Sequence, residues 1–277
     1  MKRFILTYFI VLLMTAAYAQ KMPQDYFNEA VQWEGAGKPD AAIANYHYII
    51  KHHPRNKIYV NALYNLGNAF ATKKDYRQAI AAYEKVVNSG YDDKTLVGGD
   101  IMASPFGNLK HYASMGIYEA YDSLKQYDSA LVYLNQANNV NSYEHFCGNA
   151  QASKDIYMSL RYADLFEHLK DSTSSEKALL QTIFHESEGN TEVVQRLISL
   201  YKYREYKRLA LEFDKAVDLL KEEADSRYPA MKNYSIIFRK TEIKIPDLFY
   251  MSADEPDRAA IQAKLKGCYF RGMLESL

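Results

Sequence analysis

Histidines are the side chains in this sequence with the clearest potential to bind a metal. His185 and Glu186 resemble the start of a helical zinc motif, but Gly189 occupies the position where a second histidine is required. The densest histidine group precedes a proline and has no acidic or thiol partner close in sequence, although structural zinc needs four ligands. This group consists of His47, His52 and His53. We therefore predict no metal site.

Cysteine offers the other candidate chemistry, that of a nucleophile. Cys147, followed by glycine, resembles a thiol-protease loop, with His168 and His185 downstream as candidate bases. No wider signature supports it, and the sequence lacks a nucleophile elbow, a phosphate-binding glycine loop and a Cys-x-x-Cys pair. We predict no enzymatic activity and no cofactor. Two buried free thiols are expected, with a bridge between Cys147 and Cys268 as the alternative.

The first residues have the three-part layout of a secretory signal peptide. Lys2 and Arg3 precede an apolar run over residues 4–14, and Ala-Tyr-Ala at 17–19 supplies the small-residue cleavage site. The run is too short to cross a bilayer, which needs about 20 residues, and no later stretch is long enough and apolar enough. We expect cleavage before Gln20, a periplasmic or extracellular location and no remaining transmembrane segment.

The charge of the chain argues against a nucleic-acid partner. The 34 basic residues equal the 34 acidic ones, and removal of residues 1–19 would leave 32 against 34. Binding to nucleic acid generally depends on a basic surface. We therefore expect none.

Two segments near the amino terminus share one pattern of paired helices. In each, apolar and small residues recur at steps of three and four on either side of a polar turn. In the second segment Asp75 and Gln78 have the spacing of an N-cap and capping box. The first segment has Tyr26, Ala30, Trp33, Ala42, Tyr46, Ile49 and Pro54; the second has Leu63, Leu66, Gly67, Phe70, Ala79, Tyr83 and Val86.

Both segments resemble tetratricopeptide repeats, which are helix-turn-helix units of about 34 residues. The resemblance implies an all-α, right-handed repeat solenoid and a protein or peptide partner. A third copy keeps the spacing mainly in its second half, and the pattern decays towards the carboxyl terminus, where terminal repeats are expected to be atypical. The third copy is marked by Tyr121, Ala130, Leu134 and Ala137.

The pattern and its interruptions predict five segments. Turn-forming residues at 88–105 and 138–151 indicate long connections, and Glu242–Ile245 alternates like a short strand. Pro256 opens a last, capping helix, expected to carry Ile261, Leu265 and Cys268 on one face. The segments are a signal peptide at 1–19, two well-matched repeats at 20–91, a connecting loop at 92–105, degenerate hairpins at 106–225, and an irregular segment with the capping helix at 226–277.

Tyrosine is unusually abundant, with 25 residues in 277. Tyr26, Tyr46 and Tyr83 occupy repeat positions expected to be buried. The resemblance places another group on helix positions that face the concave groove of the family. This group comprises Asn61, Tyr64, Asn68 and Tyr112. Tyrosine offers contact area at low entropy cost and asparagine offers adaptable hydrogen bonding, so the group suits recognition; solvated surface residues or contacts to a neighbouring helix are the alternatives.

The sequence thus predicts a non-enzymatic, exported scaffold that binds a protein or an extended peptide in its concave face. The lysine and arginine residues with which some chaperone-binding members of the family grip a peptide terminus are missing around Asn68, so that mode is not expected. A periplasmic protein that binds a glycan or small ligand is one alternative. An enzyme with an unfamiliar site built from the long connections is another.

Overall fold

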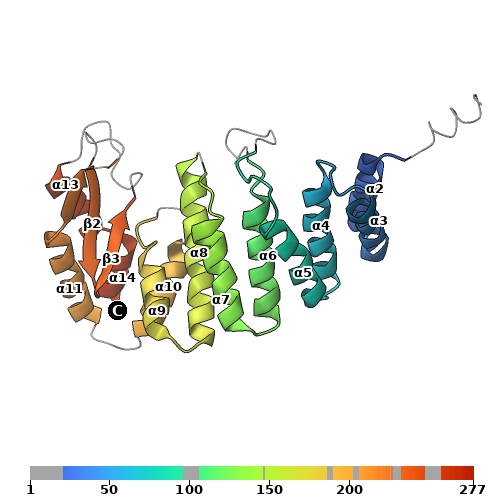
Figure 1. Cartoon of the computed structure of the whole chain (residues 1–277). Coiled ribbons are helices and arrows are strands. Elements are labelled where there is room, and N and C mark those ends of the chain that lie inside the picture. Colours follow the sequence, from blue (N-terminus) through green and yellow to red (C-terminus); the bar gives the residue numbers. More distant parts are fainter. Residues whose placement is uncertain are drawn as a thin grey trace, which may run out of the picture. The chain divides into compact units, whose positions relative to one another are not determined.

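The computed structural model describes residues 21–95, 106–145, 147–185, 190–201, 206–224, 226, 232–246 and 257–277. The predicted signal peptide, its cleavage site before Gln20, most of the connection at 92–105, Glu186, Gly189 and Pro256 lie outside these residues. The chain divides into two compact units (Figure 1). The first comprises residues 1–95 and 108–141, the second residues 96–107 and 142–277.

The first unit consists of three consecutive helical hairpins. Each helix packs against the next one along the chain, and α4 also packs against α6. The hairpins are α2 (Pro23–Gly35) with α3 (Pro39–His52), α4 (Tyr59–Thr72) with α5 (Tyr76–Val87), and α6 (Leu109–Ser123) with α7 (Tyr127–Asn135). The predicted fold class, an all-α helix-turn-helix repeat solenoid, is confirmed for this unit.

The turns inside the hairpins share one backbone geometry. Gly37, Lys74 and Lys125 each have a positive φ, of 68°, 60° and 58°. The next residue donates its amide to the carbonyl of an aromatic residue five positions back, a bond typical of a helix that ends in a left-handed residue. The pairs are Lys38 with Trp33, Asp75 with Phe70, and Gln126 with Tyr121. Asp75 is an N-cap as predicted, because its carboxylate accepts the Gln78 amide.

The same turn appears once more, in the second unit. Lys170 has a φ of 59°, and the amide of Asp171 donates to the carbonyl of Phe166. This turn joins α8 (Gly148–His168) to α9 (Ser172–Leu180). A fourth hairpin therefore follows the rule of the first three, although its sequence no longer shows the full pattern of small and large residues.

The predicted long connection at 138–151 is wrong at both ends. Helix α7 continues into a π-helix, η1 (Gln136–Val140), and α8 already begins at Gly148. The ring nitrogen Nδ1 of His111, a buried residue of α6, lies 3.0 Å from the Ala137 carbonyl and 3.1 Å from that of Asn141. The imidazole thereby joins the end of the π-helix to α6, and Asn141 adds a hydrogen bond to Ser114 on the same helix.

The second unit adds a sheet to its helices. After α8 and α9 come α10 (Asn190–Tyr201), α11 (Tyr206–Asp218), and the strands β1 (Lys221–Ala224), β2 (Lys232–Phe238) and β3 (Thr241–Ile245). The strands form an antiparallel sheet in the order β1-β2-β3, with Ile236 opposite Ile243. The alternation at 242–245 does form a strand, but the all-α prediction did not include a three-stranded sheet, and β1 begins inside the segment predicted as helical hairpins.

The carboxyl terminus folds into two short helices where one was predicted. Helix α13 (Arg258–Lys266) buries Ile261 and Leu265, and α14 (Tyr269–Ser276) packs against α10 and α11. Cys268 is the N-cap of α14, beyond the end of α13, so its predicted place on the face of one continuous helix is wrong. The break lets α14 add Phe270 and Leu274 to the core of the second unit.

Within the described residues, no helix combines the length and the apolar character needed to cross a membrane.

Candidate functional site

The predicted groove residues Tyr64, Asn68 and Tyr112 lie together in the first unit. We call these three residues and Asn61 the tyrosine strip. The ring centroids of Tyr64 on α4 and Tyr112 on α6 are 6.5 Å apart, although the connection between the second and third hairpins separates them in sequence. Asn61 is exposed on α4, one turn before Tyr64. The neighbouring first helices of two hairpins thus present one polar and aromatic surface.

Tyr83 forms the floor below the strip. Its ring is buried between two glycines: a Cβ atom built on Gly67 would clash with the ring, and one built on Gly116 would lie 2.6 Å from it. Its hydroxyl donates a 2.6 Å hydrogen bond to Oδ1 of Asn68. The ring centroid of Tyr64 lies 5.8 Å from that of Tyr83. Helices α4, α5 and α6 therefore meet around one aromatic ring, which sets the height and orientation of the strip.

Hydrogen bonding and burial fix the protonation of these tyrosines. Burial raises the pKa of Tyr64. The hydrogen bond with Asn68 lowers this pKa, whereas the nearby Tyr112 and Glu119 raise it further. Burial raises the pKa of Tyr83 as well, with further contributions from Tyr64, Glu119 and Glu34. Both hydroxyls are consequently protonated at any ordinary pH, and the neighbouring charges are carboxylates. The strip is a neutral surface in a negative environment.

A second polar chain joins the first hairpin to the second. The hydroxyl of Tyr46 on α3 donates a 2.7 Å hydrogen bond to Glu34 on α2, and accepts one of 3.2 Å from Asn65 on α4. Tyr46 is fully buried and Tyr83 nearly so, as predicted. Tyr26 is only half-buried and stacks on Tyr48 with the ring centroids 4.1 Å apart, so its predicted burial is wrong.

Comparison with known proteins identifies the hairpin that carries most of the strip. Residues 60–89 match the tetratricopeptide repeat family. This repeat contains Asn61, Tyr64 and Asn68 on its first helix and Tyr83 on its second. Among curated proteins, none matches the chain.

Several solved structures resemble the chain at low identity. Two crystal structures of MamA are each 18% identical; one match covers 62% of this chain and 82% of MamA with a TM-score of 0.43, the other 65% and 81% with a TM-score of 0.45. A thermophilic TPR protein of Thermus thermophilus is 20% identical over 71% of this chain and 91% of its own, with a TM-score of 0.36. With TM-scores below one half, these likenesses carry no further argument.

The candidate pair of Cys147 and His168 does not come together. Cys147 is the N-cap of α8 and His168 is the last residue of the same 21-residue helix, which places them about 30 Å apart. Nε2 of His185 lies 3.4 Å from a carboxylate oxygen of Asp155. Both cysteines are free, and burial raises the pKa of the Cys268 thiol to about 11. The structure therefore gives no support to a Cys147–His168 pair.

The histidine group packs against aromatic rings. His47 lies edge-on to Phe70, with ring centroids 6.1 Å apart, and His52 and His53 lie beside Tyr48 at 4.5 and 5.9 Å. In the part of the chain that the structure describes, no three His, Cys, Asp or Glu side chains are arranged to hold a metal ion.

Two residues that hold the hairpins of the first unit together were missed in the sequence analysis. Gly116 makes room for Tyr83 from the side of α6, and Asn65 links α4 to Tyr46. Their signals were present but weak: Gly116 is a small residue inside a predicted helix, and Asn65 is one asparagine among several on α4. Gly116 stands one residue earlier in α6 than Gly67 does in α4, so it does not fall on the small-residue position that the repeat pattern predicts.

Proposed function

We propose that this protein is a non-enzymatic, exported scaffold that binds a protein or an extended peptide through the tyrosine strip. Proteins with tetratricopeptide repeats generally act as protein-interaction scaffolds, and the matched repeat supplies three of the four strip residues. The proposal assigns the strip to α4 and α6, whose first-helix positions face the partner in that family.

The observation that carries the proposal is the convergence of Tyr64, Asn68 and Tyr112 on one surface. Tyr112 is 40% exposed and is among the large side chains of the first unit that are not covered by the fold. Tyr64, 6.5 Å away, is held in place by Asn68 and Tyr83. A rigid aromatic surface beside an amide loses little conformational entropy on binding, which is the property of residues that dominate interfaces.

The charges around the strip indicate the chemistry of the partner. Glu119 is exposed on α6 and acts electrostatically on Tyr64, while Glu34 on α2 acts on Tyr83. The strip itself contains no lysine or arginine. A partner that presents basic side chains gains attraction to both carboxylates and can place a cation over the Tyr112 ring. An acidic peptide terminus would be repelled.

The test compares matched tyrosine variants of the full chain. Tyr112→Ala combined with Asn61→Ala removes exposed strip groups, whereas Asn68 is left intact because it accepts the hydrogen bond of Tyr83. Tyr269→Ala is the control, since Tyr269 is 46% exposed on α14.

Each variant is used to capture proteins from an envelope extract, and the affinity for every protein recovered by the wild type is then measured. Truncation of a binding hot spot costs about 2 kcal/mol or more, which is roughly a thirtyfold loss of affinity. The proposal expects that loss for the strip variant and near-wild-type affinity for Tyr269→Ala. Equal affinities for both variants would exclude the strip as the binding surface.

A glycan array distinguishes the alternative function. Stacked tyrosines can bind sugar faces as well as peptides, so the same surface could serve a periplasmic glycan-binding protein. Retention of the wild type on glycans, lost in the strip variant and without a protein partner, would replace the scaffold by this alternative.

Export is a separate part of the proposal and has its own test. The supporting features are the basic residues, short apolar run and Ala-Tyr-Ala site of the first 19 positions. We expect the protein recovered from the envelope or medium of the producing cell to begin at Gln20. Amino-terminal sequencing that finds intact Met1 there would contradict cleavage.

A further inference from the structure

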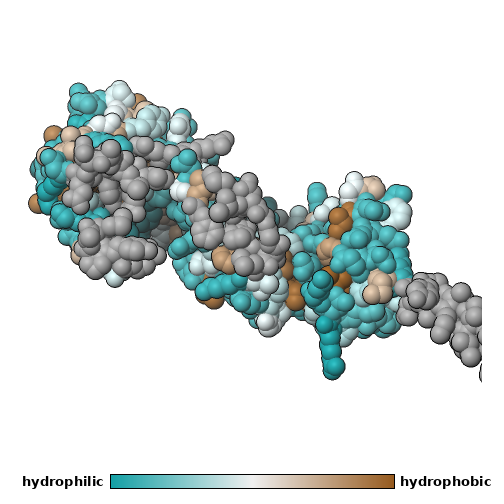
Figure 2. Space-filling view, turned by 90° about the horizontal axis from the view of Figure 1, so that it is seen from above, coloured by the Kyte–Doolittle hydropathy of each residue, from teal (hydrophilic) through white to brown (hydrophobic). Residues whose placement is uncertain are grey.

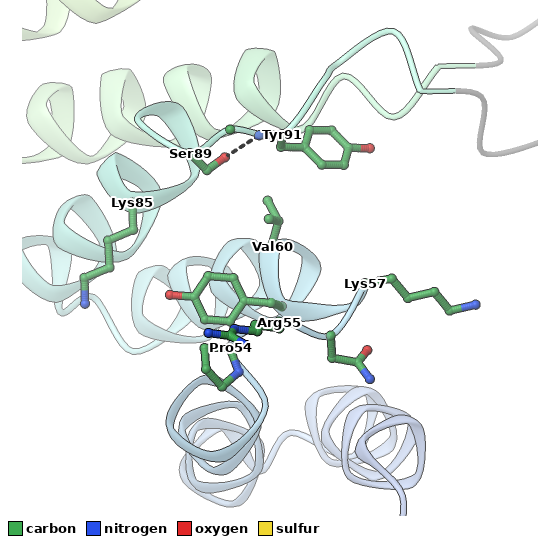
Figure 3. A pocket seen from close by; sticks show the side chains of 10 residues that line it. Pro54, Arg55, Lys57, Val60, Lys85, Ser89 and Tyr91 are labelled. Carbon is green, nitrogen blue, oxygen red and sulfur yellow. Dashed lines mark hydrogen bonds between the residues drawn. The ribbon is translucent and has the colours of Figure 1, made fainter.

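A pocket of about 610 Å³ lies in the first unit, away from the tyrosine strip (Figure 3). The connection between α3 and α4 contributes Pro54, Arg55 and Lys57, the first turn of α4 contributes Val60, and the end of α5 and the residues after it contribute Lys85 and Tyr91. It shares no residue with the strip. Its volume is within the range of sites that hold small organic ligands, about 300–1,000 Å³.

The charged groups that line the pocket are all positive. Arg55, Lys57 and Lys85 are exposed and form no ion pair with any described residue. No aspartate or glutamate lines the pocket. Three basic side chains, none of them in an ion pair with a described carboxylate, therefore line one pocket.

The acidic residues next to the pocket in sequence accept hydrogen bonds from other groups. Glu84 accepts the hydroxyl of Tyr133, Asp92 accepts the backbone amide of Lys94, and Asp93 accepts the amide of Lys110 at the start of α6. The carboxylates of Asp92 and Asp93 raise the pKa of Tyr91, after burial as the main cause. Neither forms an ion pair with a pocket cation among the described residues.

The start of α4 adds a further positive element. Its N-cap, Ile58, provides no side-chain acceptor, but the amides of Ile58 and Tyr59 donate to the side chain and the carbonyl of Asn56, which lines the pocket. The start of a helix still carries a partial positive charge that favours anions. This element reinforces the three basic side chains.

The walls between the cations are apolar only in part. In Figure 3, Val60 and Tyr91 lie on one side of the pocket, Pro54 and Arg55 on the other, and Lys57 and Lys85 at opposite ends. The hydroxyl of Ser89 accepts the Tyr91 amide at 3.3 Å, which anchors the Tyr91 backbone beside the pocket. An open pocket that has basic side chains around it and apolar groups between them favours an anionic ligand with an apolar part.

We propose that this pocket binds an organic anion that carries two or more carboxylate or phosphate groups around an apolar or ring-shaped centre. The lysines at the two ends hold the outer anionic groups, and the Arg55 guanidinium can bind one of them through two parallel hydrogen bonds. Val60 and Tyr91 contact the centre of the ligand. The site is independent of the tyrosine strip, so a failure of either proposal leaves the other intact.

Isothermal titration of the full chain with two probes tests the site. Benzene-1,3,5-tricarboxylate offers three carboxylates on a ring, and fructose 1,6-bisphosphate offers two phosphates at the ends of a sugar. Neutral benzamide is the control ligand. We expect at least one anionic probe to bind, with an affinity that falls as salt screens the charges, and no binding of benzamide. The tighter probe identifies carboxylate or phosphate as the preferred group.

Matched charge variants locate the binding. Lys57→Gln combined with Lys85→Gln is expected to weaken binding of the anionic probe about tenfold. Arg77→Gln removes an exposed charge from the opposite end of α5 and is expected to bind like the wild type. All three side chains are exposed, so circular dichroism should show unchanged folding. Absence of binding by both probes, or equal affinity of the double variant and Arg77→Gln, overturns the proposal.

Discussion

The two units use different side chains to join their helices. In the first unit, buried tyrosines donate to glutamate or asparagine on the other helix of the same hairpin, as Tyr46 does to Glu34 and Tyr83 to Asn68. In the second, partly buried arginines bind carboxylates far away in sequence, as Arg271 does Asp214 and Arg239 does Glu176. The first pattern repeats along the chain with the hairpins. The second depends on residues about 60 positions apart and follows no repeat.

This difference explains the distribution of recognisable sequence signal. A hairpin that packs only on its neighbours needs the same small and large residues each time, so its sequence repeats. The core of the second unit is closed by β2, α11 and α14 around Phe213, Phe238 and Phe270. These three positions belong to no repeated pattern in the sequence. Most of the face seen in Figure 2 is hydrophilic, with hydrophobic residues in small groups. The distinction between the units therefore lies in their cores.

The largest expected effect is that of Phe213→Ala in the second unit. Phe213 is fully buried, and its ring centroid lies 5.4 Å from that of Phe238 and 5.5 Å from that of Phe270. Loss of a buried phenylalanine costs about 3–5 kcal/mol because a cavity remains. Chemical denaturation should show this loss in the transition of the second unit. If the change instead lowers the stability of both units equally, they unfold as one body and the comparison fails.

Gly67→Ala tests the corresponding close contact in the first unit. The new methyl group would meet the Tyr83 ring, which cannot retreat because Gly116 lies against its other side. Overpacking of this kind costs about 1–3 kcal/mol. Gly272→Ala on α14 is the control, since nothing lies within 4 Å of its added methyl group and a helical alanine should stabilise by roughly 0.5–1 kcal/mol. Thermal melting that shows the same sign for both changes would refute the packing around Tyr83.

Arg271→Gln tests the ion pairs of the second unit. The guanidinium binds both carboxylate oxygens of Asp214, at 2.9 and 3.0 Å, and both side chains are largely buried. Leaving Asp214 without this partner should cost about 1–3 kcal/mol. Lys266→Gln removes an exposed pair with Asp218 and should change stability by less than about 1 kcal/mol. Denaturation curves that rank the two changes in the opposite order would contradict a structural role for the arginines.

Three tyrosines of the first unit are expected to lose their protons at a higher pH in the folded protein than in the unfolded chain. Burial, with the hydrogen bond to Glu84, raises the pKa of Tyr133 to about 12, and burial also raises the pKa values of Tyr46 and Tyr83. The folded state retains protons that the unfolded chain releases near pH 10. The stability tied to these protons is present below pH 10 and is lost as the pH rises towards 12. Tyrosine absorbance that completes its change near pH 10 in the folded protein would show that these hydroxyls are not buried.

Sequence could predict the first unit because local rules decide its structure. The spacing of Ala79, Tyr83 and Val86 established the second hairpin, and the N-cap at Asp75 was found where expected. The fourth hairpin could have been recognised from Phe166 and the turn four residues later, since Trp33, Phe70 and Tyr121 precede their turns in the same way. That signal is an aromatic residue followed by a left-handed turn residue, and it survives where the core pattern fades.

The second unit was less predictable because its partners are distant in sequence. The three-stranded sheet requires β2 to pair on both sides, and only β3 shows clear alternation. The break between α13 and α14 follows from burial of Phe270 and Leu274 against α10 and α11, which the local pattern of 261–268 does not reveal. The register of the repeat pointed to the strip residues as candidates, but the contacts of Gly116 and Asn65 become visible only in the three-dimensional structure.

The most direct test of the central claim is a chemical-shift map of the first unit with a bound peptide. Peptides selected from a random library against the full chain would be titrated into isotope-labelled protein, with Tyr112→Ala as the matched variant. The account predicts that the largest shifts cluster at Asn61, Tyr64, Asn68 and Tyr112, that selected peptides are rich in basic residues, and that Tyr112→Ala weakens binding by about thirtyfold. Shifts confined to the second unit, or selected acidic peptides that bind Tyr112→Ala as tightly as the wild type, would contradict it.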